Sequence, residues 1–478
     1  MKRVLVILIS CISFLNLTAK DFSNKLDSYS KKIFREIQSF KGSDILLLPK
    51  KFGYPFESKD NKVYVNLLVE VHPGSNLNAG KFQIVSRAGD VLHLKTEITK
   101  ISEVLDDPAI TRAAFGRCYR LHLDSARSIS EVDLAHKGSN LPRSYTGKRV
   151  LIGIFDSGID LQHPDFKTEN GTRILFLWDM GEEFSPKPPQ GYDWGREYTK
   201  IEIDDNLDSV YQKDLLGHGT QVAGIAGGNG RARPEFVGFA PEADFIIVNG
   251  IRNGSFGSFS DADILAACNY IFSKAEELGK PCVINLSLGS IIGSHDNEDL
   301  LGKALSNLVA EKNGRAIVAS AGNEGEILIH SGAELKENNR YELLLYPVNL
   351  CNYEPALCPD IPGYFLFGAD VWTDIDLIDS VYVGIYETNN LTVVDEKGFS
   401  SKDIVDKVQI FNSADSLVGL VSISSSSFKN SENFMIFISN EGQTTLPIDS
   451  YLWSIVFVAK DNGRFDSWAV LPIGSQEN

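Results

Sequence analysis

The stretch KRVLIGIF, residues 148–155, is the most informative segment for the fold of the central part of the chain. After its two basic residues it is apolar without interruption. Such a run is typical of a strand buried on both faces, and strands of this kind occur in parallel sheets covered by helices on either side. The stretch therefore predicts the central strand of a parallel sheet.

The segments that follow alternate between helix and strand. Helices are predicted at residues 218–227, 261–278 and about 298–312, and strands at 243–249, 282–288 and 315–320. The second helix opens on Ser260-Asp261-Ala262-Asp263, a pattern typical of a capped N-terminus. Strands that alternate with helices indicate an α/β fold with a doubly wound parallel sheet.

The flanking regions have a different character. Residues 62–72, KVYVNLLVEVH, predict a strand and residues 97–106 a helix, which together fit a small α+β unit over about 62–125. Between residues 340 and 470, short strands follow one another without helices: RYELLLYPV, SVYVGIYE, DKVQIF, LVGLVSIS, FMIFIS and LWSIVFVA. This second region predicts a β-sandwich or jelly roll.

The bulk properties bound the class of protein. A chain of 478 residues is too long for one hydrophobic core, so we expect two to four domains. There are 46 Lys and Arg against 63 Asp and Glu, a formal charge of −17. Nucleic-acid-binding proteins usually present a basic face, so this balance argues against a nucleic-acid partner.

The first nineteen residues resemble a targeting segment. Lys2 and Arg3 precede an apolar run that ends near Ala19, which is the pattern of a cleaved secretory signal and is short for a transmembrane helix. We therefore expect an exported protein, in the extracellular space, the periplasm or the cell envelope. An alternative is a lipid anchor on Cys11, because Leu8-Ile9-Ser10-Cys11 resembles a lipobox.

Cysteine placement agrees with an oxidising compartment. Cys351 and Cys358 lie close together in a loop-like stretch and could form a disulfide. Cys118, Cys268 and Cys282 sit in apolar surroundings and are expected to be buried thiols. No Cys/His spacing suggests a zinc site.

Three polar residues stand where a parallel sheet collects its reactive groups. Asp156 closes the strand in IGIFDSGID, His218 opens a helix in GHGTQVAGIAGG, and Asn323 follows the strand IVAS in SAGNEG. Ligands and reactive groups gather at the carboxyl ends of such strands. A buried carboxylate is costly unless it is paired, so we expect Asp156 to have a partner.

Asp, His and Asn supply what acyl transfer needs besides its nucleophile. The imidazole takes the proton from a serine hydroxyl, and the carboxylate orients the imidazole and stabilises its charged form. An Asn amide can donate to the developing oxyanion, a contribution worth roughly 3–4 kcal/mol of transition-state stabilisation in known enzymes. Each residue alone is weak support, since a single Asp or His at such a place is usually structural.

The surrounding motifs are more specific. D-S-G-I-D-x-x-H-P-D-F, G-H-G-T-x-V-A-G and S-A-G-N-E-G occur in this order over residues 146–331, and together they resemble the subtilisin family of serine peptidases. The resemblance implies that Asp156 orients His218, that His218 is the general base, and that Asn323 donates to the oxyanion. It also implies that Ser287, Leu288 and Gly289 pair with the substrate backbone as a strand.

Further stretches narrow the resemblance. TRILFLWD, PPQGYDWGREYT, GGNGRARPEFVGFAPEA and GKPCVINLSLGSIIGSHD are similar to the branch of clostridial spore-germination proteases, which carry a jelly-roll insert after the oxyanion Asn. After the signal peptide predicted at 1–19, the resemblance implies a prodomain-like unit within residues 20–125 and a catalytic domain at 126–335. The insert would occupy residues 336–470, and residues 471–478 would begin the return to the catalytic domain.

One family feature is missing. The nucleophilic serine of the family stands in G-T-S at the start of a buried helix, and no G-T-S occurs in the 478 residues. We expect either a truncated peptidase, with a catalytic sheet incomplete at its C-terminus and no activity of its own, or a pseudoprotease that binds peptides or a partner protease. The intact Asp156, His218 and Asn323 favour truncation.

Other candidate sites are weaker. Asp165, in H-P-D, matches a calcium ligand of subtilisins, but acidic partners are not evident in GNGRARPEF, so a solvated loop carboxylate is the simpler interpretation. No cofactor is otherwise expected. We expect His295 and His330 to be surface residues, and Trp178, Trp194 and Trp372 to serve packing. The expected partners are a protein or peptide substrate and the chain's own prodomain.

Overall fold

The structure is a computed structural model of the whole chain, and it describes most residues between 22 and 470. Outside the description lie residues 1–21, 23, 40–44, 46–55, 60–61, 74, 76, 78–81, 116–119, 122–129, 183–185, 206, 208–209, 211, 235, 253–258, 324–328, 346–365, 389–391, 404, 440–450 and 471–478. The predictions for the leader at 1–19, for Cys11, Cys118, Cys351 and Cys358, and for residues 471–478 all fall in these segments.

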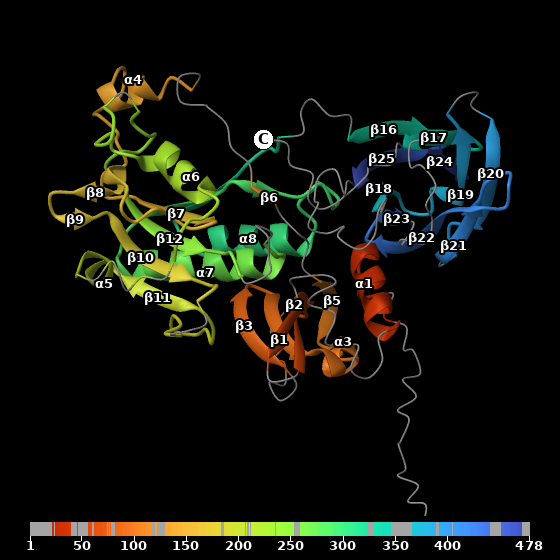
Figure 1. Cartoon of the computed structure of the whole chain (residues 1–478), viewed down its shortest axis with the longest axis horizontal. Coiled ribbons are helices and arrows are strands. Elements are labelled where there is room, and N and C mark those ends of the chain that lie inside the picture. The colour runs from red at the N-terminus through yellow and green to blue at the C-terminus, as the bar shows by residue number, and fades with distance from the viewer. Residues whose placement is uncertain are drawn as a thin grey trace, which may run out of the picture.

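A six-stranded sheet forms the centre of the molecule (Figure 1). Its middle strand is β7 (Leu151–Asp156), and all six residues of β7 are buried. The order is β11-β10-β12-β7-β13-β15, with every pair parallel except the edge strand β11. The bounds are β10 (Ile174–Asp179), β11 (Arg196–Thr199), β12 (Asp244–Asn249), β13 (Cys282–Leu286) and β15 (Arg315–Ala319). The predicted parallel sheet is present.

Helices cover both faces of this sheet. On one face lie α7 (Asp261–Glu277) and α8 (Leu300–Ala310), and on the other lies α6 (His218–Gly227) (Figure 1). Ser260 caps α7 by accepting from the Asp263 amide, as the capping pattern predicts. Shorter elements of this domain are α4 (Val132–Lys137), η3 (Pro164–Phe166), β8 (Lys167–Thr168), β9 (Gly171–Thr172) and α5 (Lys200–Asp205).

An N-terminal unit lies against α7 and α8. Its antiparallel sheet has the order β1-β2-β4-β3, with β5 on the other side of β2. Its elements are α1 (Ser28–Ser39), β1 (Phe56–Lys59), β2 (Lys62–Val71), β3 (Gln83–Ala88), β4 (Val91–Glu97), η2 (Ile98–Lys100), α3 (Ile101–Leu105) and β5 (Ile110–Phe115).

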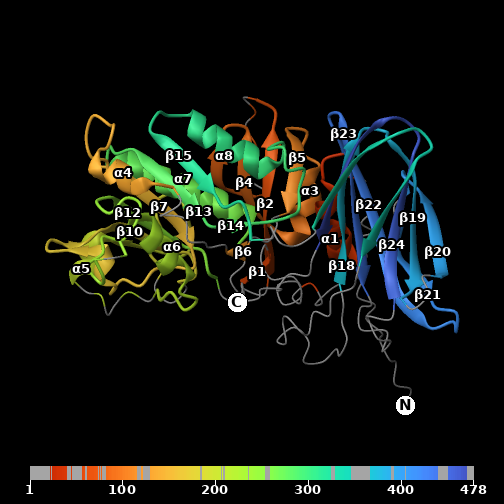
Figure 2. The same cartoon turned by 90° about the horizontal axis from the view of Figure 1, so that it is seen from above.

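This unit begins earlier than the predicted 62–125. Phe22, Leu26 and Phe34 are buried in the same apolar cluster as the strands. The amphipathic helix α1, which the sequence analysis missed, supplies part of this core and also contacts β22 and β23 (Figure 2). Its position between two units explains why both of its sides are covered.

The β-rich region consists of two antiparallel sheets around a shared apolar core. One sheet has the order β16-β25-β18-β23-β22-β21 and the other β17-β24-β19-β20. The bounds are β16 (His330–Leu335), β17 (Arg340–Leu345), β18 (Leu366–Asp374), β19 (Ile378–Glu387), β20 (Val393–Ser400), β21 (Val405–Phe411), β22 (Leu417–Phe428), β23 (Ser431–Ser439), β24 (Tyr451–Ala459) and β25 (Gly463–Val470). Because β16 pairs with β25, the region starts by residue 330 and not at 336.

Several side-chain predictions can be compared with the structure. Cys268 and Cys282 are buried free thiols, as predicted. Trp178 is buried and packs within 6 Å of Tyr192, Trp194 and Tyr270, which confirms a packing role. His295 and His330 are exposed, and both rings lie on Trp468. Trp372 is half-buried in β18. Among the described residues, no helix is both long and apolar enough to cross a membrane.

Candidate active site

The carboxyl edge of the central sheet brings polar side chains together. Asp156 is the last residue of β7, and its register partner Asn249 is the last of β12. Asp179 ends β10 beside Asn249. Parallel strands that end at one edge place their following residues in the same crevice, so the sheet assembles these groups from distant parts of the chain.

Asp156 and His218 are in direct contact. Nδ1 of His218 lies 2.8 Å from Oδ1 of Asp156, and the same oxygen accepts from the Ser157 amide at 2.7 Å. Because Asp156 is buried, its charge depends on these donors. Burial raises the pKa of the Asp156 carboxyl, and the hydrogen bond from His218 opposes that rise. The expected pairing of Asp156 is therefore present.

Two glycines allow His218 to reach the strand end. Gly217 has a φ of +73°, a left-handed conformation that glycine adopts without strain. A Cβ on Gly219 would lie 2.1 Å from the carbonyl oxygen of Gly158 and 3.1 Å from Oδ1 of Asp156. Only a residue without a side chain permits this approach, so Gly219 sets how close α6 comes to β7.

Asp214 holds the loop that precedes His218. Its Oδ1 accepts from the Ser157 hydroxyl at 2.7 Å and from the Gly217 amide at 3.0 Å. Its Oδ2 accepts from the amide and the hydroxyl of Thr220 at 2.8 and 2.6 Å. Ser157 in turn accepts from the Gly219 amide. Asp214 therefore fixes the backbone on both sides of His218.

Nε2 of His218 is the atom that would exchange a proton. With Nδ1 donating to Asp156, Nε2 carries the lone pair of a neutral imidazole. Nε2 is buried, and within the described part of the chain it has no hydrogen-bond partner. The pair can thus accept a proton from a hydroxyl placed at Nε2, and none of the described hydroxyls occupies that place.

The structure corrects one expectation about Ser287–Gly289. Pairing with a substrate, as the resemblance implies, requires unpaired backbone groups here, but β14 (Leu288–Gly289) pairs antiparallel with β6 (Arg120–Leu121). An edge strand presents unpaired N–H and C=O groups that any extended segment can satisfy. Here the segment that follows the N-terminal unit satisfies them.

Asn323 lies at the same edge of the sheet, four residues beyond the end of β15, and is exposed. Ser320 ties this loop to the β14 segment, because its hydroxyl donates to the Leu288 carbonyl at 3.1 Å and its amide to the Leu286 carbonyl at 3.0 Å. These two hydrogen bonds join the loop before Asn323 to the segment that contains β14.

One face of the strands β13 and β15 is open. Cys282, Ile284 and Leu286 point into the cluster under α7 and α8. The alternate residues Val283 and Asn285 are half-buried, and Val318, the partner of Asn285 across the strands, is 54% exposed. Apolar residues of a parallel sheet are normally covered on both faces. This open face lies beside the part of the sheet that α6 covers.

Sequence reasoning missed Asp179, Asn249 and Asp214. Asp179 is buried and accepts from the Asn249 amide at 2.9 Å and from the Gly181 amide at 3.1 Å through the same oxygen. Burial raises the pKa of Asp179 to about 6. Asp179 and Asn249, like Asp156, come directly after an apolar run, and that pattern could have identified them. The role of Asp214 depends on contacts that no such pattern reveals.

The fit of a calcium ion at Asp165 is poor. Asp165 is buried and not a solvated loop carboxylate, and its Oδ1 accepts from the Ala232 amide at 2.7 Å. Calcium takes six to eight oxygen ligands. In the described part of the chain, no three His, Cys, Asp or Glu side chains converge to hold a metal ion.

The chain is similar in sequence to known serine proteases. The sequence model described as the subtilase family matches residues 147–447. The chain is 31% identical over 196 residues to the PI-type proteinase of Lactococcus lactis subsp. cremoris, which covers 38% of this chain and 10% of that protein. It is 32% identical over 180 residues to the major intracellular serine protease of Bacillus subtilis (strain 168). This match covers 38% of this chain and 44% of that protein.

A solved structure is also similar. The Clostridium perfringens CspB protease matches with a TM-score of 0.54 and 24% identity, over 71% of this chain and 65% of that one. This likeness bears on the fold, which is that of a subtilisin-like protease. The aligned region spans less than half the length of the two curated relatives named above.

Proposed function

Because this chain belongs to the subtilase family, we propose that it contributes the Asp–His half of a serine endopeptidase. Asp156 orients His218, His218 takes the proton of a serine hydroxyl at Nε2, and the Asn323 amide donates to the oxyanion. The observation that carries the proposal is the 2.8 Å contact between Asp156 and His218, with a buried Nε2 that has no partner among the described residues.

The nucleophile is proposed to come from a helix outside the described residues. The open face at Val318 supports this, because an apolar sheet face beside His218 is where such a helix would be buried. On this proposal the sheet described here is incomplete and the chain by itself does not hydrolyse peptide bonds. The β-rich region is proposed to be the jelly-roll insert implied by the clostridial resemblance.

Substrates are proposed to bind as an extended strand along Ser287–Gly289. The pairing of β14 with β6 supports this, because β6 already occupies the strand position by backbone contacts. β6 follows the N-terminal unit directly, so this unit is proposed to be the prodomain, with its C-terminal segment lying in the substrate cleft. The leader at residues 1–19 supports the proposal that the protein is exported, and we propose no cofactor.

A second candidate function is a pseudoprotease that binds peptides without cleaving them. The specific observation in its favour is the combination of a peptide-pairing strand with an Nε2 that faces no described hydroxyl. The two candidates differ in whether a serine is ever delivered to His218.

A fluorophosphonate probe, which labels activated serines, separates the candidates. The 478-residue chain should remain unlabelled. A chain extended by the codons that follow in its gene should be labelled, and His218→Ala should abolish the label while Gln162→Ala, on the exposed loop beyond Asp156, should not. If no reading frame encodes a G-T-S segment, or if the extended chain stays unlabelled, the pseudoprotease is favoured. His218-dependent labelling of the 478-residue chain would show that the nucleophile lies within it.

A further inference from the structure

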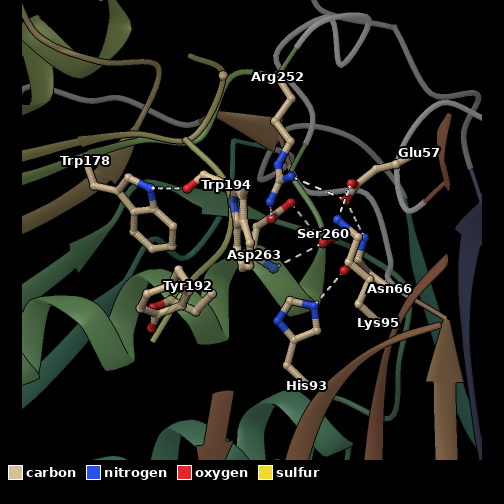
Figure 3. A network of polar contacts seen from close by, with 12 residues as sticks. Glu57, Asn66, His93, Lys95, Trp178, Tyr192, Trp194, Arg252, Ser260 and Asp263 are labelled. Atoms are coloured by element: carbon tan, nitrogen blue, oxygen red, sulfur yellow. Dashed lines mark hydrogen bonds and ion pairs between the residues drawn. The ribbon is translucent and has the colours of Figure 1, made fainter. Parts of the chain in front are cut away.

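The N-terminal unit meets the catalytic domain through a row of buried and half-buried charges (Figure 3). Lys95 and Glu57, both of the N-terminal unit, lie 2.7 Å apart. Arg252 and Asp263, both of the catalytic domain, lie 2.6 Å apart. The two pairs join where Arg252 lies 3.3 Å from Glu57. The order across the interface is therefore cation, anion, cation, anion.

Because of this order, the charges of each unit remain paired when the two units separate. Each unit contributes one complete ion pair, so undocking would leave neither unit with an uncompensated charge. Breaking a buried pair by removing one partner is strongly destabilising, but separating two intact pairs is not subject to that cost. Glu70 likewise keeps a partner in its own unit, because it lies 3.7 Å from Arg112 and also contacts Lys303 of α8. The charges of this interface are thus compatible with reversible docking.

A histidine stands inside the same interface. His93 is buried on β4, and its Nε2 lies 2.9 Å from Oδ1 of Asn66. The other end of the Asn66 amide donates to Glu57 at 2.6 Å, so Oδ1 must be the acceptor and His93 Nε2 the donor. A neutral imidazole that donates from Nε2 has its lone pair on Nδ1. Nδ1 is buried and has no hydrogen-bond partner among the described residues.

The groups around His93 disfavour a second proton. Burial lowers the pKa of His93 to about 3, with Arg252 and Lys95 adding to the effect and Glu57 opposing it. From the β3 side its register partner is Ser86, which is uncharged. Asp263 on α7 is paired with Arg252, and Lys303 on α8 is paired with Glu70. The Trp194 ring lies edge-on to the imidazole at 6.2 Å.

We propose, resting on the assignment of the N-terminal unit as a prodomain, that this unit docks reversibly on α7 and that protonation of His93 releases it. The apolar part of the contact is formed by Leu68, Ala88 and Val91, which join the cluster under α7 and α8. When the unit leaves, His93 gains access to water and can bind a proton. Acid thereby favours the undocked state.

The direction and size of the effect follow from linkage. The ordinary pKa of a histidine is about 6.5, so docking excludes a proton that the free unit binds below that pH. The docking equilibrium should weaken about tenfold between pH 7.5 and 5.5, and about a further tenfold by pH 4.5. Burial alone would raise the pKa of Glu57, but Arg252 and Lys95 more than offset it and hold it at about 2. Glu57 therefore adds to the weakening only as the pH falls to about 4.5, the ordinary pKa of its carboxyl, and below.

Asp263 acts in the opposite sense. Burial raises its pKa, so the docked state binds that proton more readily than an exposed carboxyl would. A variant that changes His93 alone keeps Asp263 and thus isolates the histidine. His93→Gln is the suitable change, because the amide of glutamine can still donate to Asn66 but binds no proton.

Thiol labelling of the full chain tests the proposal. Ser86→Cys places a reporter thiol beside His93, at a position 9% exposed when docked. Its labelling rate, divided by that of a model thiol at each pH, should rise about tenfold from pH 7.5 to 5.5. With His93→Gln added, the rise should stay within about twofold. His72→Gln, an exposed histidine of the same unit, should leave the tenfold rise unchanged.

Cys282, 1% exposed in the catalytic domain, reports global unfolding in the same sample and should remain slow. If Ser86→Cys does not fold, Ala88→Cys on the same strand replaces it. A rise that persists with His93→Gln, or no rise in the reporter chain, would overturn the proposal. Because no readout requires peptidase activity, such a result leaves the proposed endopeptidase function to its own probe experiment.

Discussion

Asp156 and His218 are separated by 62 positions in the sequence, and their side chains meet at 2.8 Å across the carboxyl edge of the sheet. The contact is made possible by Gly219, where the backbone of α6 comes against the Gly158 carbonyl and the Asp156 carboxylate. The geometry of this pair therefore depends on a residue that has no side chain.

Gly219→Ala should displace the start of α6. The new Cβ would lie 2.1 Å from the Gly158 carbonyl oxygen, so the helix must move or the strand end must shift. We expect a loss of about 1–3 kcal/mol in the free energy of unfolding, measured with denaturant. Gly224→Ala is the matched control in the same helix, because nothing lies within 4 Å of its added Cβ. The control should be neutral or more stable by about 0.5–1 kcal/mol. Equal effects of the two changes would contradict the role given to Gly219.

Asp214→Asn should loosen the loop before His218. One carboxylate oxygen becomes an NH2 group that faces two donors, either Ser157 and Gly217 or both donors of Thr220. Hydrogen bonds to charged groups contribute about 1.5–3 kcal/mol each, so we expect a loss of about 2–4 kcal/mol by denaturant unfolding. Asp160→Asn is the control: Asp160 is exposed and its side chain accepts from the Gln162 amide at 2.8 Å. A loss no greater than that of the control would show that Asp214 does not hold the loop.

Asp179→Asn should raise stability at neutral pH. The folded pKa is about 6 and the ordinary value 3.8, so the folded state binds more protons between these values. Through this carboxyl the wild type loses stability as pH rises from about 4 to 6, by roughly 3 kcal/mol in all. Asparagine keeps the oxygen that accepts from Gly181 and Asn249 and has no charge to bury. The variant should gain most over the wild type at pH 7.5 and little at pH 4, and a difference that does not change with pH would contradict the assignment.

Proline at both positions of β6, R120P/L121P, should open the strand position beside β14. Successive N–H groups of a strand point to opposite sides, so one of the two faces β14 and is lost. A fluorescent peptide of residues 116–125 should then bind at least about tenfold more tightly than to the wild type, by fluorescence polarisation. A scrambled peptide serves as the control. Unchanged affinity would mean that β6 does not compete for the substrate strand.

Local sequence patterns predicted the central domain closely. The apolar run at 148–155 predicted a buried parallel strand, and β7 lies there. The helix predicted at 218–227 is α6. Asp156 and His218 could be identified because their motifs are local: a short stretch of sequence fixes a strand end, a glycine turn and a helix start. Periodicity and turn chemistry act over a few residues, so they are visible without a partner.

Tertiary structure alone decided the rest. The apolar residues of α1 are buried by strands that lie elsewhere in the chain, and β16 belongs to the β-rich region because it pairs with β25 at the far end of the described chain. The occupied strand at Leu288–Gly289 depends on a segment that lies over 160 residues earlier. No motif in the sequence marks His93, and only the packing of β4 against α7 buries it beside Arg252 and Glu57. Burial and charge pairing are properties of what surrounds a residue, and no local pattern carries them.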